Sequence, residues 1–231
     1  QLIYQKKGAK NYMGKSRKEI AYDYIKPKIV FCELKPGDIL DEKKIIEELG
    51  FSRTPIREAI SELAEEKLVT IMPRRGIVVT QISLKDVEDM LNARALLEPY
   101  IFQNAFPNVE KDVLLRMKNQ LNDMIAHKKV KMDSLEEDFD YSFHMYFAEK
   151  ANNQYLYRMM HLLMTHSQRI RSFSTMHQER YIDSYKEHIE IIDMMLSGDE
   201  DKVMEAVKKH ISNTVEGYKQ IYSIQGSFFG I

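Results

Sequence analysis

Four ionisable residues in the second half of the chain have the types and spacing of a divalent-metal site. Asp140 and His144 are four residues apart, and on a helix this spacing places both side chains on one face. His188 and His210 each fall on an apolar stripe of a later helical pattern, so three separate helices direct ionisable groups toward a core. Burying such groups separately is costly because each needs a partner, whereas one divalent ion would satisfy all four.

The donor set limits which ion would fit. Three neutral imidazoles and one carboxylate suit Zn²⁺, Ni²⁺, Mn²⁺ or Fe²⁺, and an ion that takes more than four ligands keeps positions open for a small molecule. Alternatively, each histidine is an ordinary hydrogen-bonded core residue, and Asp140 and His144 simply bond to each other. The spacing leaves both interpretations open, since it cannot place the three helices side by side.

Arginines in the same part of the chain offer a second kind of chemistry. Arg94, Arg169 and Arg171 lie in helical segments, and a guanidinium can bind a carboxylate through two parallel hydrogen bonds. We expect Arg94 and Arg169 to hold a small carboxylate effector, against the alternative that they are surface arginines of a helical bundle.

The first half of the chain carries residues that could bind nucleic acid. Arg53 and Arg57 lie four residues apart on a predicted helix that begins after Ser52, and they flank its buried stripe of Ile56, Ile60 and Leu63. An arginine fork can bind guanine through O6 and N7, or a phosphate. The alternative is that both arginines pair with surface acids such as Glu58 or Glu62.

The elements that would position these arginines form a domain over residues 16–82. A capping box at SRKE begins a first helix, which Pro27 should kink or divide, and a turn is expected over residues 34–40. A second helix ends at Gly50, and a third follows Ser52, which we expect to cap it. Two β-branched strands, 68–72 and 77–82, are joined by PRRG as a hairpin. This order describes a winged helix-turn-helix, whose third helix enters the major groove.

Residues 83–223 show only helical periodicity. A variant capping box, SLKD, opens this region, and breaks near 107–108, 131–134, 152–153, 176–179 and 198–199 predict six helices in an antiparallel bundle. The predicted fold class is therefore mainly α: a winged helix-turn-helix followed by an all-α domain. Residues 1–15 are expected to be a mobile arm, and residues 224–231 a tail.

Composition is consistent with this division. Residues 1–80 hold 16 Lys and Arg against 12 Asp and Glu, a net +4, whereas the remaining residues hold 18 and 23, a net −5. A basic N-terminal part and an acidic C-terminal part are consistent with a protein that contacts nucleic acid through its first domain alone. The single cysteine, Cys32, gives no internal disulfide, and no apolar run is long enough to span a bilayer. We therefore expect a cytoplasmic protein with no membrane partner.

The first domain resembles a known family over residues 16–82. The segment SRTPIREAI with a PRRG wing, within PGDIL…IIEELGFSRTPIREAISELAEEKLVTIMPRRGIVV, is similar to the N-terminal domain of the GntR family of bacterial regulators. In that family a glycine usually stands where this chain has Cys32. The resemblance and the wing position together imply a set of DNA-contacting residues: Lys43, Ser52, Arg53, Thr54, Arg57, Arg74, Arg75 and Gly76.

The second domain is similar to the FCD effector domain of the FadR subfamily, through LNARALLEPYIFQNA, FDYSFHMYFAEKANNQYL and EHIEIIDMMLSGDEDKVMEAVKKHI. In metal-binding members, an Asp with a His four residues later and two further histidines about 22 apart hold the ion. The resemblance thus implies that Asp140, His144, His188 and His210 are ligands. Some members of the subfamily lack the metal.

Together these observations predict a regulator and not an enzyme. We expect a homodimeric repressor that binds double-stranded operator DNA. It would respond to a small carboxylate bound beside a metal ion. A metal-sensing regulator, in which the ion itself is the signal, remains an alternative. A metal-dependent hydrolase is a further one, although no HExxH-type motif supplies a general base.

Overall fold

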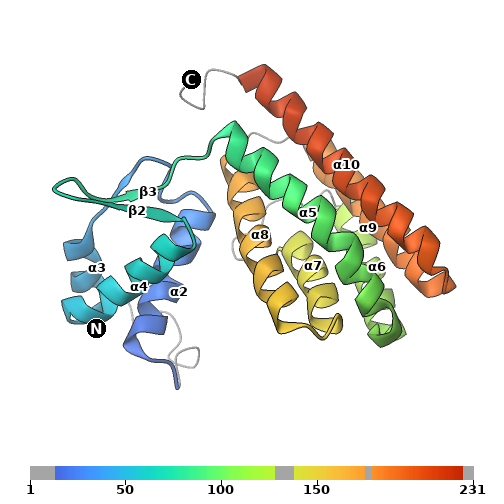
Figure 1. Ribbon diagram of the computed structural model, residues 1–231, viewed down its shortest axis with the longest axis horizontal. Coiled ribbons are helices and arrows are strands. Elements are labelled where there is room, and N and C mark those ends of the chain that lie inside the picture. The colour runs from blue at the N-terminus through green and yellow to red at the C-terminus, as the bar shows by residue number, and fades with distance from the viewer. Residues whose placement is uncertain (1–13, 128–137, 175–177, 226–231) are drawn as a thin grey trace. The chain divides into compact units, whose positions relative to one another are not determined.

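The computed structural model describes residues 14–127, 138–174 and 178–225 (Figure 1). The chain forms two compact units, residues 1–81 and 82–231. Most of the expected arm and tail lies outside the described residues. None of the described helices is long and apolar enough to cross a membrane.

The first unit opens with helix α2 (Arg17–Val30), and the predicted capping box is present. Ser16 and Glu19 each accept a hydrogen bond from the other's backbone N–H. The expectation that Pro27 divides this helix is wrong, because α2 continues to Val30. Proline removes only one backbone donor, and the buried Ile25 and Ile29 hold the segment against the core on both sides of it.

Helices α3 (Glu42–Leu49) and α4 (Arg53–Glu65) follow as the helix-turn-helix pair. Gly50 ends α3 with a left-handed backbone (φ 68°), which glycine adopts without the clash that a Cβ would cause. The predicted stripe of α4 is buried, with Ile56, Ile60 and Leu63 each at most 1% exposed. The recognition-type helix is therefore anchored by one apolar face, leaving its N-terminal turn in solvent.

A three-stranded sheet completes the first unit. Strands β2 (Val69–Met72) and β3 (Gly76–Val79) form the predicted hairpin, with Met72 paired to Gly76. Strand β1 (Ile39–Leu40) pairs antiparallel with β3, so the order is β1-β3-β2. Residues 39–40 were expected to belong to a turn, and the structure corrects this.

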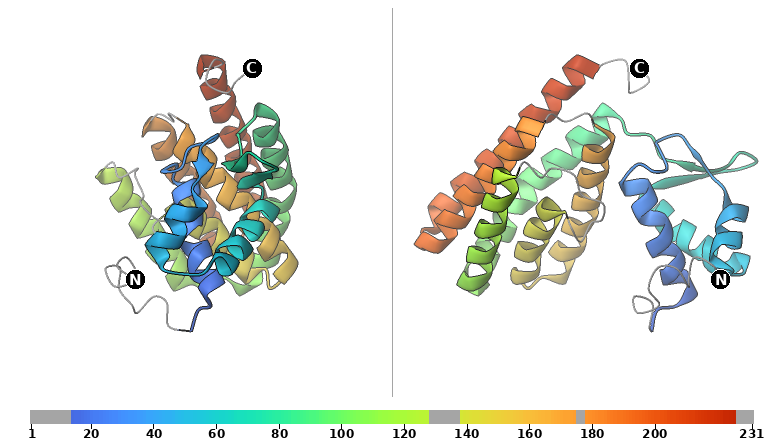
Figure 2. Two further views of the ribbon diagram at one scale, coloured as in Figure 1. Left: turned by 90° about the vertical axis from the view of Figure 1, so that its left-hand side faces the viewer. Right: turned by 180° about the vertical axis from the view of Figure 1, so that it is seen from behind.

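Among its described residues, the second unit contains six α-helices, as the sequence predicts. They are α5 (Leu84–Ala105), α6 (Lys111–Ala126), α7 (Phe139–Lys150), α8 (Gln154–Phe173), α9 (Gln178–Ser197) and α10 (Glu200–Gln225), with a short 3-10 turn, η2 (Phe106–Asn108), after α5. Helix α10 packs along α5 and α9, α7 packs against α8, and α6 against α9 (Figure 2). The predicted second capping box, Ser83 with Asp86, begins α5.

An aromatic cluster forms part of this unit's core. Phe102 of α5 stacks on Phe147 of α7 with ring centroids 4.1 Å apart, and Phe143 lies edge-on to Phe147 at 5.0 Å. Phe143 also lies 4.3 Å from the ring of His188. The apolar packing therefore continues directly into the polar residues at the centre of the bundle.

Candidate metal centre and nucleic-acid interface

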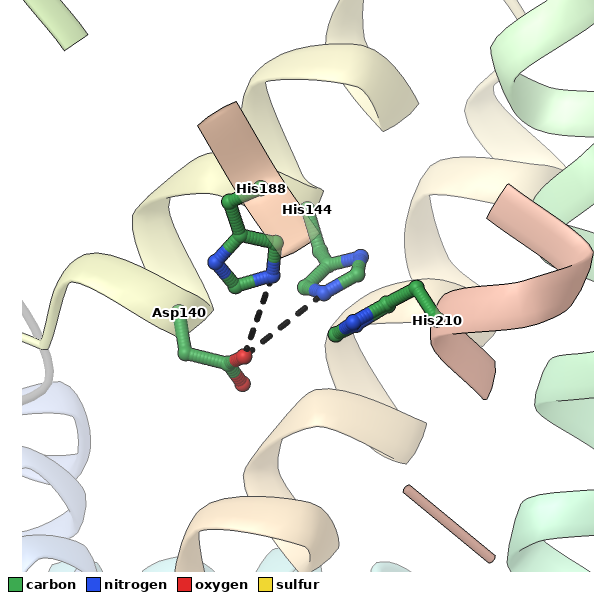
Figure 3. Close-up of side chains that lie close together, drawn as sticks. All are labelled: Asp140, His144, His188 and His210. Carbon is green, nitrogen blue, oxygen red and sulfur yellow. Dashed lines mark ion pairs between the residues drawn. The ribbon is translucent and has the colours of Figure 1, made fainter. Parts of the chain in front are cut away.

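The four residues proposed as metal ligands converge on one point in the second unit (Figure 3). Helix α7 provides Asp140 and His144, α9 provides His188, and α10 provides His210; one ligand atom from each lies within 4.8 Å of the others. Asp140 Oδ1 is 3.5 Å from His188 Nε2 and 3.7 Å from His144 Nε2. Helical packing thus supplies the convergence that sequence spacing could not.

The imidazoles are buried, and their nitrogens are incompletely paired. All three rings are at most 1% exposed. Neither ring nitrogen of His188, nor Nε2 of His210, has a hydrogen-bond partner among the described residues. Buried polar atoms without partners are costly, so three nitrogens and one carboxylate facing one another fit a divalent transition ion.

Two carboxylates that sequence reasoning missed hold the outer nitrogens of two of these rings. Glu98 Oε2 lies 3.0 Å from Nδ1 of His144, and Glu187 Oε2 lies 2.7 Å from Nδ1 of His210. A carboxylate at Nδ1 fixes the ring's tautomer and turns Nε2 toward an ion. Both could have been suspected from their positions, since Glu98 follows Arg94 by four residues and Glu187 immediately precedes His188.

Arginines connect these carboxylates into one network. Arg94 pairs with Glu98 at 2.5 Å, and Arg180 pairs with Glu187 at 3.2 Å. Arg171 contacts the Asp140 carboxylate and also pairs with Asp138 at 2.7 Å. We call these six residues the outer network: Arg94, Glu98, Asp138, Arg171, Arg180 and Glu187. It contacts three of the four candidate ligands, Asp140, His144 and His210.

The network shifts the proton affinities of the ligands. Burial alone would raise the pKa of Asp140, but Arg171 and the facing histidines outweigh it and hold that pKa well below its usual range. Burial and the neighbouring His210 lower the pKa of His188 well below its ordinary value. Burial also lowers the pKa of His210. These three groups are therefore in the protonation states that metal coordination requires.

His144 behaves differently. Burial would lower its pKa, but the carboxylates of Glu98 and Asp140 outweigh burial and raise it. Burial likewise opposes ionisation of Glu98, yet Arg94 and His144 lower the pKa of that carboxyl to about 2. An ion bound at His144 would therefore have to displace a proton from that ring.

The two arginines expected to bind an effector occupy different surroundings. Arg94 is 1% exposed, and its Nη2 lies 3.4 Å from Nε2 of His144, at the edge of the candidate metal centre. Its Nη1 donates to Ser167. Arg169 is buried on α8, the helix that also carries Arg171. Of the two, Arg94 has the geometry of a group that could reach a molecule bound at the ion.

In the first unit, the predicted arginines lie together at the exposed N-terminal turn of α4. Arg53 and Arg57 are more than half exposed, and both contact Glu42 at the start of α3. Both arginines therefore do pair with an acid, as the alternative interpretation held, but the acid is Glu42 and not Glu58 or Glu62. Lys43 and Thr54 are exposed nearby in sequence.

Ser52 and the wing complete the set of predicted DNA contacts. Ser52 stands at the N-cap position of α4, but its hydroxyl makes no capping hydrogen bond, so the expected cap is absent. Arg74, Arg75 and Gly76 are exposed at the hairpin tip. Arg74 (φ 67°) and Gly76 (φ 96°) both have left-handed backbones there, which form the tight turn of the wing.

Two family models match the chain. Residues 17–79 match the model described as bacterial regulatory proteins, gntR family, and residues 89–213 match the FCD domain. The first match includes every predicted DNA-contacting residue, and the second includes all four candidate ligands. FCD domains often bind metal, in agreement with the cluster on α7, α9 and α10.

Relatives and solved structures agree with these matches. The HTH-type transcriptional repressor RspR of Escherichia coli (strain K12) is 27% identical over 209 residues, 90% of this chain and 91% of RspR. The gluconate operon transcriptional repressor of Bacillus licheniformis is 28% identical over 133 residues, 57% of this chain and 54% of that protein. The structure of E. coli McbR/YncC shares the fold, with a TM-score of 0.74 at 17% identity over 89% of this chain and 99% of that one.

Proposed function

Because the chain belongs to the GntR family of bacterial regulators and carries an FCD domain, we propose that it is a metal-containing, acid-responsive repressor. In this proposal the first unit binds operator DNA, and the second binds a divalent ion and a small organic acid. Its relatives are named as transcriptional regulators, which confirms the prediction of a regulator and gives the hydrolase alternative no support.

One observation carries the metal part of the proposal. Three buried imidazoles and a carboxylate face one another within 4.8 Å, and His188 and His210 have ring nitrogens without a hydrogen-bond partner among the described residues. Asp140, His144, His188 and His210 would hold the ion. When bound, a divalent transition ion supplies a Lewis-acidic centre that attracts a carboxylate oxygen.

Arg94 supports the assignment of an acid as the effector. Its guanidinium is buried beside His144, with Glu98 and Ser167 fixing two of its nitrogens. A fixed cation at the edge of a metal centre favours an anionic ligand. The acid would change operator affinity only if it binds the DNA-competent and DNA-incompetent states differently.

We also propose that the repressor acts as a homodimer through the second unit. Helices α5 and α8 pack against each other and expose large apolar side chains, among them Leu96 (78%) and Tyr100 on α5, and Met159 and Leu162 on α8. Exposed apolar residues of this size are typical of protein interfaces. A two-fold dimer would match the pseudo-palindromic operators of helix-turn-helix proteins.

The metal and acid proposals can be tested together on purified protein. A duplex is first selected by the protein from a random-sequence pool, and its affinity is measured by fluorescence anisotropy. The measurement is repeated on protein stripped of metal by a chelator, and again after Zn²⁺, Ni²⁺, Mn²⁺ or Fe²⁺ is added back. Gluconate and other mono-, di- and tricarboxylic acids are then added to both the metal-free and the metal-loaded protein. We expect an acid to change the affinity only when metal is present.

The His188→Ala variant is expected to purify without metal and to lose the acid response, because the central ligand is gone. Elemental analysis gives the first result and anisotropy the second. A change in affinity with metal alone, and none with any acid, would favour the metal-sensing regulator. Stoichiometric metal in His188→Ala would rule out the site.

A further inference from the structure

A single carboxylate joins the two arginines at the N-terminus of α4. Glu42 Oε1 lies 3.0 Å from Nε of Arg53 and 3.2 Å from Nε of Arg57. The Glu42 side chain is 18% exposed, whereas the arginine side chains are 60% and 62% exposed. The anion is thus mostly buried, and the two cations it holds are presented to solvent.

The backbone fixes the position of Glu42. It is the first residue of α3 and follows the N-cap Asp41, whose side chain accepts hydrogen bonds from the backbone N–H groups of Lys43 and Lys44. Helix α3 packs against α4. Because a helix N-terminus favours negative charge, the Glu42 carboxylate is stabilised where it meets the arginines.

The atoms used in these contacts matter for recognition. The closest contact of each arginine to Glu42 is made by Nε, which lies on one edge of the guanidinium. The opposite edge carries the two terminal amino groups, and such a pair matches O6 and N7 of guanine. Glu42 can therefore hold both arginines without occupying the edges that would read bases.

The same carboxylate also acts on the electrostatics of the surface. Arg53 and Arg57 carry two positive charges, and Glu42 cancels one of them. Affinity for DNA of any sequence depends on the number of phosphates neutralised. An acid between the two arginines therefore weakens their attraction to backbone phosphates, whatever the sequence.

We propose that Glu42 is a specificity-determining positioning residue: it orients Arg53 and Arg57 toward base edges and reduces their binding to phosphates. This proposal rests on the proposed function, in which α4 enters the major groove. It predicts two effects of opposite sign when the charge of Glu42 is removed. Sequence-independent binding becomes tighter, and discrimination between sequences is lost.

The test compares Glu42→Gln with Glu47→Gln, which removes the same charge from an exposed position on the same helix. Affinities are measured for the duplex selected by the wild-type protein and for a scrambled duplex of equal length. We expect Glu42→Gln to bind the scrambled duplex about two- to tenfold tighter, with a salt dependence steeper by about one ion. We expect the ratio of the two affinities to fall by about tenfold or more.

For Glu47→Gln both affinities should change together, so that their ratio stays at the wild-type value. A ratio for Glu42→Gln equal to that of Glu47→Gln would overturn the proposal. If the Glu42→Gln variant does not fold, the Glu42→Asp variant tests the proposal instead. It keeps the charge but withdraws the carboxylate, so the ratio should fall while scrambled-duplex affinity stays constant, and an unchanged ratio would again overturn the proposal.

Arg53→Ala and Arg57→Ala separate this inference from the proposed function. If neither change weakens binding to the selected duplex, the DNA-binding surface itself is wrongly assigned. If both weaken it while the Glu42 variants keep the wild-type ratio, only the role of Glu42 fails.

Discussion

The three histidines of the candidate metal centre differ in what orients them. Glu98 forms an ion pair with Nδ1 of His144 and Glu187 bonds to Nδ1 of His210, whereas no carboxylate among the described residues contacts Nδ1 of His188, whose ring packs against Phe143. Glu98 is fully buried with Arg94, so its removal would leave a buried charge unpaired. Glu187 is the better residue for testing the outer network, because its surroundings are less enclosed.

We expect Glu187→Gln to weaken metal binding by about 10- to 100-fold, since His210 loses the carboxylate that orients it. The affinity is measured by competition with a chelator of known strength. Glu190→Gln is the matched control, because Glu190 lies on the same helix and pairs with the exposed Lys209. Equal affinities for the two variants would show that Glu187 does not orient a ligand.

Cys32 offers a second prediction at this scale. It follows α2 with a left-handed backbone (φ 57°), a conformation in which the Cβ of any L-residue is crowded. This is the position where a glycine is usual in the family. Cys32→Gly should raise the free energy of unfolding by about 1 kcal/mol, as measured by chemical denaturation. Cys32→Ser keeps the Cβ, so a gain of similar size in that variant would refute the explanation.

The candidate ligands could be found in the sequence, but which ligand each supporting residue contacts could not. Asp140 and His144 share a helix, and the histidines stand on apolar stripes, so their burial was predictable. Glu98 lies 46 positions before His144, and Arg171 lies 31 after Asp140. Nothing in the spacing indicates such pairs, because they depend on which helices pack together and at what rotation.

At the scale of elements, the N-termini of α3 and α4 are stabilised differently. Asp41 accepts two backbone hydrogen bonds at the start of α3, whereas the Ser52 hydroxyl makes no capping bond for α4. A side chain at an N-cap that does not cap the helix is available for another partner. In the proposed function that partner is DNA.

Alanine substitutions should separate the two roles. Asp41→Ala is expected to lower the free energy of unfolding by about 1 kcal/mol, because two N–H groups lose their acceptor. Ser52→Ala should change it by less than about 0.5 kcal/mol while weakening operator binding. Thermal or chemical denaturation and anisotropy give the two readouts. A loss of stability in Ser52→Ala as large as in Asp41→Ala would contradict this assignment.

Elements with strong local signals were predicted correctly. Helices α5, α7 and α9 of the second unit end beside Pro107, Asn152 and Gly198, and two capping boxes mark helix starts. Strand β1 was missed because two residues have no periodicity, and it exists only through pairing with β3. Pro27 does not divide α2, because tertiary packing on both sides of it outweighs a local preference.

At the scale of the whole molecule, two units of different chemistry share one chain. If ligand binding in the second unit changes DNA affinity, DNA must change ligand affinity by the same factor. The proposed dimer would connect ligand binding to DNA binding, since the first units of both subunits must bind the same operator.

We expect the protein to sediment as a dimer at micromolar concentration and Leu96→Asp to shift it toward monomer, because a charge would be buried in the proposed interface. Analytical ultracentrifugation measures both. Leu115→Asp is the control, since Leu115 is an exposed leucine on α6. A wild-type monomer that binds the selected duplex normally, or equal dissociation of both variants, would contradict the assigned interface.

The outer network has a consequence for the size of the effector's charge. Asp140 and the network together contain four carboxylates and three guanidiniums, so with neutral imidazoles these seven residues carry one net negative charge. A divalent cation reverses this to one net positive charge. Charge in an enclosed site is costly unless it is balanced. Within this set, an anion bearing a single charge would restore electroneutrality, which favours monocarboxylates over citrate-like acids as effectors.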